Sequence, residues 1–150
     1  MINLSVDTRS LSPSMSEEHL KEVLEEMIFL AESSFDLSIE ECNGPSSFWV
    51  PTPDDEVEEL ELFGIIELGE DTTTFQKIVH LTHEVGHVIY HMDELFKNTK
   101  DTMFCEATAW YLGYHFMNEH GYTIKMSEYE KEMCFALKLY RWSENARDDE

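Results

Sequence analysis

The segment between residues 72 and 92 restricts the fold of this 150-residue chain most, because its apolar residues repeat with the period of an α-helix. His83, Glu84 and His87 fall on a different face from the apolar residues. The apolar face consists of Ile78, Leu81, Val85, Val88, Ile89 and Met92. The pattern predicts a helix with its back in the core and its histidines over a cleft. Gly86 lowers helix stability by about 1 kcal/mol relative to alanine, which indicates that another backbone passes close by.

The polar face of this helix carries the sequence HEVGH at residues 83–87, an H-E-x-x-H motif. Two imidazoles at positions i and i+4 lie one helical turn apart, so both can reach a single ion. Zinc accepts imidazole nitrogen and favours a tetrahedral arrangement of ligands. The intervening Glu84 would lie beside a water molecule activated by the metal and could accept its proton. We therefore expect His83 and His87 to be zinc ligands and Glu84 to be the general base.

A catalytic zinc site needs a third protein ligand and keeps one position open. Glu106 is the candidate, on a second predicted helix over residues 103–120 that stops at Gly121. It is a lone carboxylate on an apolar stripe formed by Ala109, Trp110, Gly113 and Met117. An ionised carboxylate in such a place is costly unless it is paired, and a divalent cation is a suitable partner.

Other polar residues near the motif are possible metal ligands or oxyanion donors. His80 and His91 fall close to His83 on the helical wheel and are alternative ligands, second-shell donors or plain surface residues. Either of them in place of Glu106 would give a three-histidine site. A tyrosine is a common donor to the oxyanion in metalloproteases, and the sequence does not choose among Tyr90, Tyr111, Tyr114 and Tyr122.

The rest of the chain predicts strands first and helices afterwards, which is typical of the α+β class. We expect a short strand before Pro13 and a helix capped by Ser14 that ends near Ser33. Strands are predicted at 46–50 and at 60–68, the latter with Gly64 as a bulge and preceded by an acidic loop at 54–59. A polar linker is expected at 93–102. A last helix, capped by Ser127, is expected to reach Trp142 and to leave a frayed polar tail.

The length of the chain limits the number of domains, and its net charge limits the kinds of partner. The chain fits a single domain over residues 1–150, with an acidic N-terminal half (1–70) and a helical C-terminal half (71–142). The net charge is −22, and residues 1–70 alone carry 18 acidic and 2 basic side chains, a net −16. That charge argues against direct binding of nucleic acid or of anionic lipid. The absence of a signal sequence and of a long apolar run, with three unpaired cysteines, leads us to expect a cytoplasmic protein.

Residues 62–117 resemble the ImmA/IrrE-type zincin-like metallopeptidases of mobile elements, phages and bacterial stress regulators. The resemblance rests on IIELGEDTTTFQKIVHLTHEVGHVIYH and on the downstream CEATAWYLGYHFM, with its E-x-x-A spacing at Glu106 and Ala109. It implies a zincin-like fold with the motif on a central helix, and a gluzincin-like ligand set of His83, His87 and Glu106. It also implies hydrolysis of a protein substrate, often a repressor, with the strand at 62–68 holding the substrate as an added strand.

Together, these observations favour a zinc-dependent metallopeptidase that cleaves a protein or peptide, for which a basic DNA-binding regulator is a candidate. The alternative is a non-enzymatic acidic interaction protein that mimics DNA and carries structural or vestigial zinc. A third interpretation keeps the site but changes the metal or the hydrolytic target.

Overall fold

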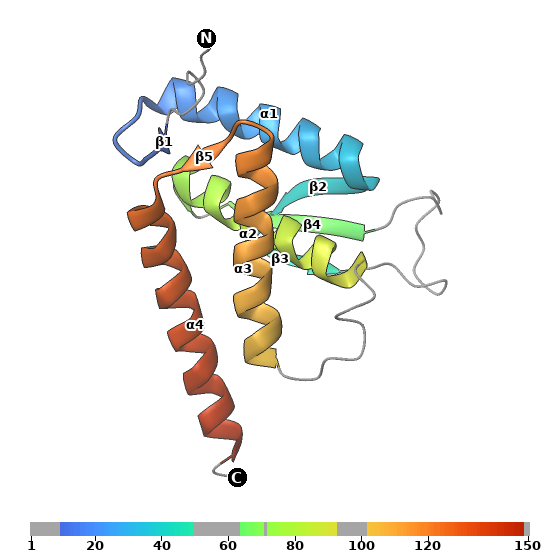
Figure 1. Cartoon of the computed structure of the whole chain (residues 1–150), viewed down its shortest axis with the longest axis vertical. Helices are drawn as coiled ribbons and strands as arrows, with labels where there is room; N and C mark the ends of the chain where they lie inside the picture. The colour runs from blue at the N-terminus through green and yellow to red at the C-terminus, as the bar shows by residue number, and fades with distance from the viewer. Residues whose placement is uncertain (1–9, 50–63, 71, 93–101, 149–150) are drawn as a thin grey trace.

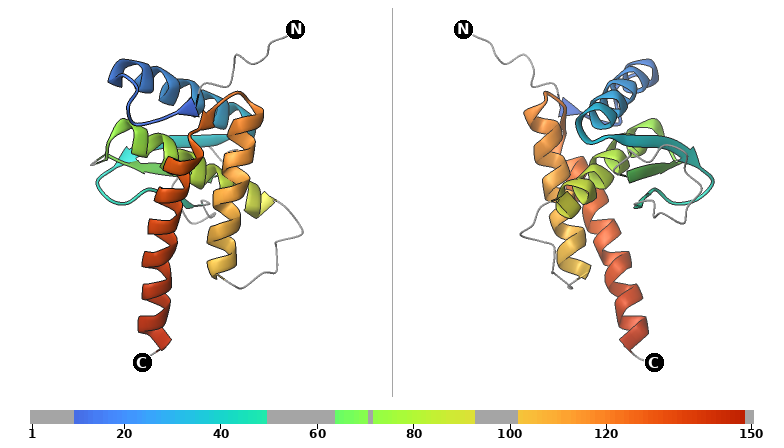
Figure 2. Two further views of the ribbon diagram at one scale, coloured as in Figure 1. Left: turned by 60° about the vertical axis from the view of Figure 1, so that its left-hand side comes forward. Right: turned by 90° about the vertical axis from the view of Figure 1, so that its right-hand side faces the viewer.

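The computed structural model describes residues 10–49, 64–70, 72–92 and 102–148, in which four helices and two small sheets form. Their order along the chain is β1 (Ser10–Leu11), α1 (Glu17–Phe35), β2 (Leu37–Cys42), β3 (Ser47–Trp49), β4 (Gly64–Gly69), α2 (Thr74–Met92), α3 (Thr102–Glu119), β5 (Thr123–Ile124) and α4 (Met126–Asp148). Helix α1 lies across one end of the molecule, and α3 and α4 extend along its long axis (Figures 1 and 2). The expected α+β class is confirmed.

Strand β4 is the centre of a mixed three-stranded sheet, with β2 parallel on one side and β3 antiparallel on the other. The register is unbroken from Gly64 to Gly69, so the bulge expected at Gly64 is wrong. A Cβ at position 64 would lie 2.3 Å from the Phe48 ring, so a larger residue there would have to displace that ring. Both sides of β4 are paired, so the expectation that this strand receives a substrate strand is also wrong. Among the described strands, β3 forms the edge of this sheet that lies beside α2.

The ends of the first three helices follow local capping signals. Ser16, not Ser14, caps α1, because the Ser14 hydroxyl is bonded to Ser12 in the preceding turn. At the start of α2, Thr73 and Gln76 satisfy each other's backbone N–H groups with their side chains, which is a capping box. Helix α3 ends before Gly121, whose φ of 91° is one that glycine adopts without strain.

Helix α4 differs most from its prediction, since it begins at Met126 and continues to Asp148. Ser127 lies inside the helix rather than capping it, and the tail expected to fray is helical. The residues after Trp142 include no glycine or proline to end the helix, and polarity alone does not stop one. The acidic loop at 54–59, the linker at 93–101 and the first part of the strand predicted at 60–68 lie outside the described residues.

The core lies where α1, α2, α3 and β4 meet. Its fully enclosed side chains include Met27 of α1, Ile66 of β4, Ile78 and Val85 of α2, and Trp110 of α3. The apolar face predicted for α2 is therefore the buried one, apart from the half-buried Ile89 and the exposed Met92. None of the described helices is long and apolar enough to cross a membrane.

Candidate metal centre

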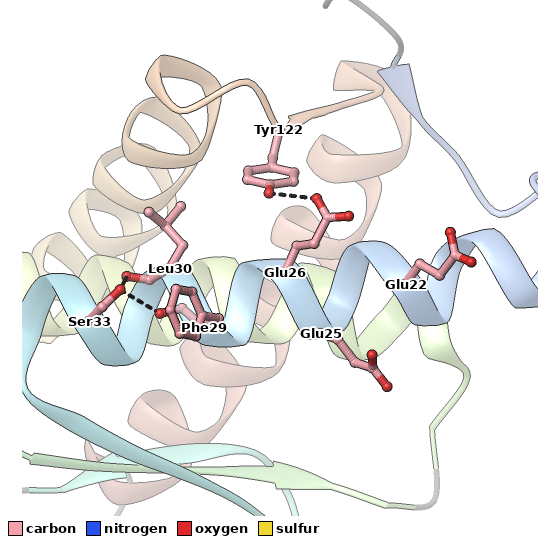
Figure 3. A pocket seen from close by; sticks show the side chains of 7 residues that line it. All are labelled: Glu22, Glu25, Glu26, Phe29, Leu30, Ser33 and Tyr122. Atoms are coloured by element: carbon pink, nitrogen blue, oxygen red, sulfur yellow. Dashed lines mark hydrogen bonds between the residues drawn. The ribbon is translucent and has the colours of Figure 1, made fainter.

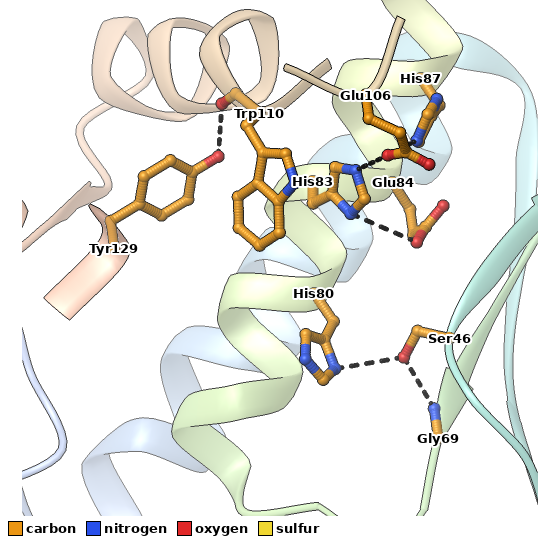
Figure 4. A network of polar contacts seen from close by, with 9 residues as sticks. All are labelled: Ser46, Gly69, His80, His83, Glu84, His87, Glu106, Trp110 and Tyr129. Atoms are coloured by element: carbon orange, nitrogen blue, oxygen red, sulfur yellow. Dashed lines mark hydrogen bonds and ion pairs between the residues drawn. The ribbon is translucent and has the colours of Figure 1, made fainter. Parts of the chain in front are cut away.

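Three side chains from two helices converge at the crossing of α2 and α3. The Nε2 atoms of His83 and His87 lie 2.9 and 3.0 Å from the same oxygen, Oε2 of Glu106. Figure 4 shows both rings pointing from α2 towards the carboxylate that α3 supplies. The structure thus brings together the three residues that the sequence selected as ligands. No other group of this kind is found among the described histidines, cysteines and carboxylates.

Two glycines allow the helices to approach closely enough for this convergence. A Cβ on Gly86 would lie 1.7 Å from the carbonyl oxygen of Ala109, and one on Gly113 would lie 1.9 Å from that of Thr82. Because both obstacles are backbone atoms, any larger residue must push the helices apart. The close approach expected at Gly86 is confirmed, and it sets how far Glu106 can reach towards α2.

Aromatic packing holds the first histidine in place. The Trp110 indole is stacked on the His83 ring, with centroids 4.2 Å apart and planes inclined by 10°. The Tyr129 hydroxyl of α4 donates a hydrogen bond to the Trp110 carbonyl oxygen (Figure 4). The His83 ring therefore has little freedom to turn away from Glu106. Sequence reasoning placed Trp110 on the correct stripe but missed this contact, because stacking depends on the helix crossing.

The donor set and its spacing suit a small divalent cation. One ligand atom from each of the three residues lies within 4.8 Å of the others. In a tetrahedral zinc site with bonds of about 2.0–2.1 Å, neighbouring ligand atoms are roughly 3.3 Å apart, so only small side-chain movements are needed to admit the ion. Two imidazole nitrogens and one carboxylate oxygen are ligands that zinc accepts. The three residues could hold a metal on these grounds, and its identity as zinc stays a prediction.

Electrostatics keep the carboxylate ionised within this cluster. Burial alone would raise the pKa of Glu106, but hydrogen bonds from His83 and His87 outweigh it and lower the pKa to about 2. Burial also opposes the charged form of His87, yet the hydrogen bond to Glu106 and the nearby carboxylates raise its pKa above the ordinary value. At His83 burial dominates and lowers the pKa. The site therefore combines one ionised acid with two imidazoles that titrate differently.

Glu84 lies beside the cluster without joining it. Only 6% of Glu84 is exposed, and its Oε2 lies 3.6 Å from Nδ1 of His83. Burial raises the pKa of Glu84 to about 7, although the nearby His87 acts in the opposite direction. A carboxyl group with a pKa near neutrality can both accept and return a proton at physiological pH.

The alternative ligands lie elsewhere. His80 Nδ1 is 3.3 Å from the Ser46 hydroxyl, which itself accepts a hydrogen bond from the Gly69 N–H (Figure 4). His91 is exposed and packs beside Phe48. Neither belongs to the three-residue group, so the three-histidine site is not formed.

A cavity of about 490 Å³ opens beside His83 and Glu84. Its walls come from the turn before β3, from α2 and α3, and from α4, which contributes Glu132, Phe135 and Ala136. The contribution of α4 could not be seen in the sequence, because it depends on how that helix packs. None of Tyr90, Tyr111, Tyr114 and Tyr122 lines this cavity.

A second hollow, of about 570 Å³, lies on α1, away from the metal cluster. Figure 3 shows its lining, in which Glu22, Glu25 and Glu26 lie along α1 on one side of Phe29 and the Tyr122 hydroxyl donates to Glu26. Phe29 is 72% exposed there. The glutamates on this face of α1 are thus exposed and line a shallow hollow.

No family model matches the chain, and comparisons with curated proteins and with solved structures give no significant match.

Proposed function

We propose that this protein is a zinc-dependent metallopeptidase with a zincin-like site. The observation that carries the proposal is the convergence of His83, His87 and Glu106, with the buried Glu84 carboxyl beside them. Two imidazoles, one acidic ligand and an adjacent base form one of the arrangements that hydrolytic zinc centres use. Zinc bound there would polarise the scissile carbonyl and make a water molecule more acidic.

The residues of the chain then have separate tasks. Glu84 accepts the proton of the attacking water and returns it to the leaving amine, for which a pKa near neutrality is suited. Trp110 holds the His83 ring in place by stacking. In the metal-free site the two histidines lower the pKa of Glu106 to about 2, so its carboxylate is already ionised before zinc binds. Removal of a general base lowers turnover by about 10²–10⁴-fold in well-studied enzymes, which is the size of effect expected for Glu84.

The outer side of β3 is the proposed docking edge for an extended substrate. Ser46, just before β3, contacts His80, and Phe48 lies beside His91, so the strand runs along α2 past the motif. A peptide paired with this edge would pass the Glu84 side of α2. Pairing of backbone groups binds an extended chain with little regard to its sequence, so selectivity must come from side-chain pockets.

The test uses peptides from a digested proteome, with new N-termini identified by mass spectrometry. Zinc-loaded wild-type protein should produce a defined set of new termini, and the Glu84→Gln variant should retain zinc and produce none. Equal cleavage by both proteins would refute the role of Glu84. A wild-type protein that holds zinc and cleaves nothing would contradict the peptidase.

The hollow on α1 favours a second candidate, an acidic interaction protein that occupies the DNA site of a basic partner. Three carboxylates and an exposed Phe29 line this hollow and offer both charge and apolar area. Such a complex should weaken steeply between about 50 and 500 mM salt, because exposed charges are screened over that range. A partner retained equally at both salt concentrations would count against this candidate.

A further inference from the structure

We infer that the cavity beside His83 and Glu84 receives a long cationic side chain, arginine or lysine, of the substrate. The inference rests on the proposed peptidase and narrows its substrate class. It assigns a specificity-determining role to Glu132 of α4, which sequence analysis did not single out.

The apolar part of the cavity fits the stem of such a side chain. Trp110, Phe135 and Pro45 line it on three sides, from α3, α4 and the turn before β3. Phe135 is 63% exposed at its position on the cavity wall, so a large apolar side chain faces solvent unless something packs on it. Long basic side chains commonly lay their methylene groups on surfaces of this kind while the charged end stays hydrated or paired.

The carboxylate of Glu132 favours a substrate side chain that ends in a positive charge. Glu132 lines the cavity, is half-buried and acts electrostatically on His80. No lysine or arginine among the described side chains forms a salt bridge with Glu132. Burial lowers the pKa of His80, so this neighbour is mostly neutral near pH 7 and leaves the carboxylate uncompensated. A cation entering the cavity would therefore meet a negative charge that has no cationic partner among the described side chains.

The distance along α2 explains why the side chain must be long. His80, the neighbour of Glu132, precedes Glu84 by four residues, which is about one helical turn of 5.4 Å. A side chain that starts near the reacting bond must span about that length before it approaches Glu132. Short side chains cannot do so, and acidic ones would meet both Glu132 and Glu84.

The experiment compares arginine with citrulline, which has nearly the same shape and no charge. N-acetyl-arginine methylamide and N-acetyl-citrulline methylamide are titrated into the full-length protein, and the indole N–H resonance of Trp110 is followed by NMR. This N–H has no hydrogen-bond partner within the described residues and lies in a residue that lines the cavity, and Trp110→Phe identifies its signal. The arginine probe should bind about two- to fivefold more tightly, as expected for a solvent-accessible ion pair.

Two variants test whether Glu132 causes the preference for the arginine probe. Glu132→Gln should bring the ratio of the two dissociation constants close to one. Glu130→Gln removes an equal charge from an exposed position on the same helix, outside the cavity lining, and should leave the ratio unchanged. Equal binding of the two probes to wild-type protein, or a preference that survives Glu132→Gln, would overturn the inference.

A second experiment measures turnover, so that failure of this inference can be distinguished from failure of the proposed function. Cleaved peptides are resynthesised with arginine or citrulline at each position next to the cut, and kcat/KM is compared. Cleavage without a preference for arginine leaves the peptidase standing and overturns the cavity assignment. A Glu132-dependent preference for arginine in binding, without any cleavage, supports the cavity and contradicts the peptidase.

Discussion

At the scale of single residues, the site depends on how burial and hydrogen bonding act differently on similar groups. Glu84 and Glu106 are both carboxyl groups near His83 and His87. Glu84 has its pKa raised to about 7 by burial, whereas Glu106 has its pKa lowered to about 2 by two imidazole donors. Environments that shift the pKa values of two acids in opposite directions are typical of sites where one group binds a cation and the other transfers protons.

Zinc affinity should depend on pH through His87. Because its pKa is raised above the ordinary 6.5, the imidazolium persists to a higher pH, and zinc must displace that proton to bind. Below this pKa the dissociation constant should increase by about tenfold per pH unit, and well above it the constant should level off. Glu106 contributes nothing to this dependence above pH 4, since its carboxyl is already ionised.

Competition with a chromophoric chelator between about pH 5.5 and 8.5 measures that dependence. His115→Ala, which removes an exposed histidine from α3, should reproduce the wild-type curve. A constant affinity across the range would show that His87 is not a ligand.

The ligands could be found from sequence because their spacing is local. The i and i+4 spacing of His83 and His87 follows directly from helix geometry, and Glu106 stood out as a charge on an apolar stripe. The roles of Ser46, Trp110 and Glu132 could not be found in the same way. Each depends on a contact between elements distant in the chain.

At the scale of elements, the crossing of α2 and α3 is the part of the fold that builds the site. An alanine at Gly86 favours an isolated helix by about 1 kcal/mol, yet here its Cβ would occupy the position of the Ala109 carbonyl. We expect Gly86→Ala to lower the free energy of unfolding by at least about 2 kcal/mol, because backbone cannot yield as a side chain can. Chemical denaturation measures this change.

A matched substitution separates this effect from the general consequences of removing a glycine. Gly44→Ala places its Cβ in open space and at an ordinary φ, so its stability should remain within about 0.5 kcal/mol of wild type. Gly86→Ala should also weaken zinc binding, since the separated helices carry Glu106 away from His87. Full stability and full zinc affinity in that variant would contradict the account of the crossing.

Element types were predictable where the periodicity was strong, as in α1 and α2. Strand order was not, because the parallel pairing of β2 with β4 joins segments separated by more than twenty residues. That order matters for function, since it moves the proposed docking edge from β4 to β3. The length of α4 was underestimated because polar residues were treated as a stop signal.

At the scale of the whole molecule, the charge of −22 is the dominant property. Few described cations offset it, since the lysine pairs are limited to Lys21 with Glu17 and Lys77 with Glu41. Self-repulsion of the remaining acids opposes folding and is screened by salt. The exposed glutamates of α1 place part of this repulsion on one helix.

Added salt should therefore stabilise the protein. The melting temperature should rise by a few degrees between about 20 and 300 mM NaCl, because screening weakens more repulsions than attractions. Differential scanning calorimetry at constant pH measures the change, with a chelator present so that zinc content stays equal. A melting temperature that falls with salt would show that attractive pairs dominate.

The central claim is that His83, His87 and Glu106 together hold one zinc ion. Metal analysis by mass spectrometry of protein purified without chelator or affinity nickel tests it most directly, on wild type, His87→Ala, Glu106→Ala and, as a control, the exposed His115→Ala. The account predicts about one zinc per chain in wild type and in the control, and a marked loss in the other two. Equal zinc content in all four proteins would contradict it.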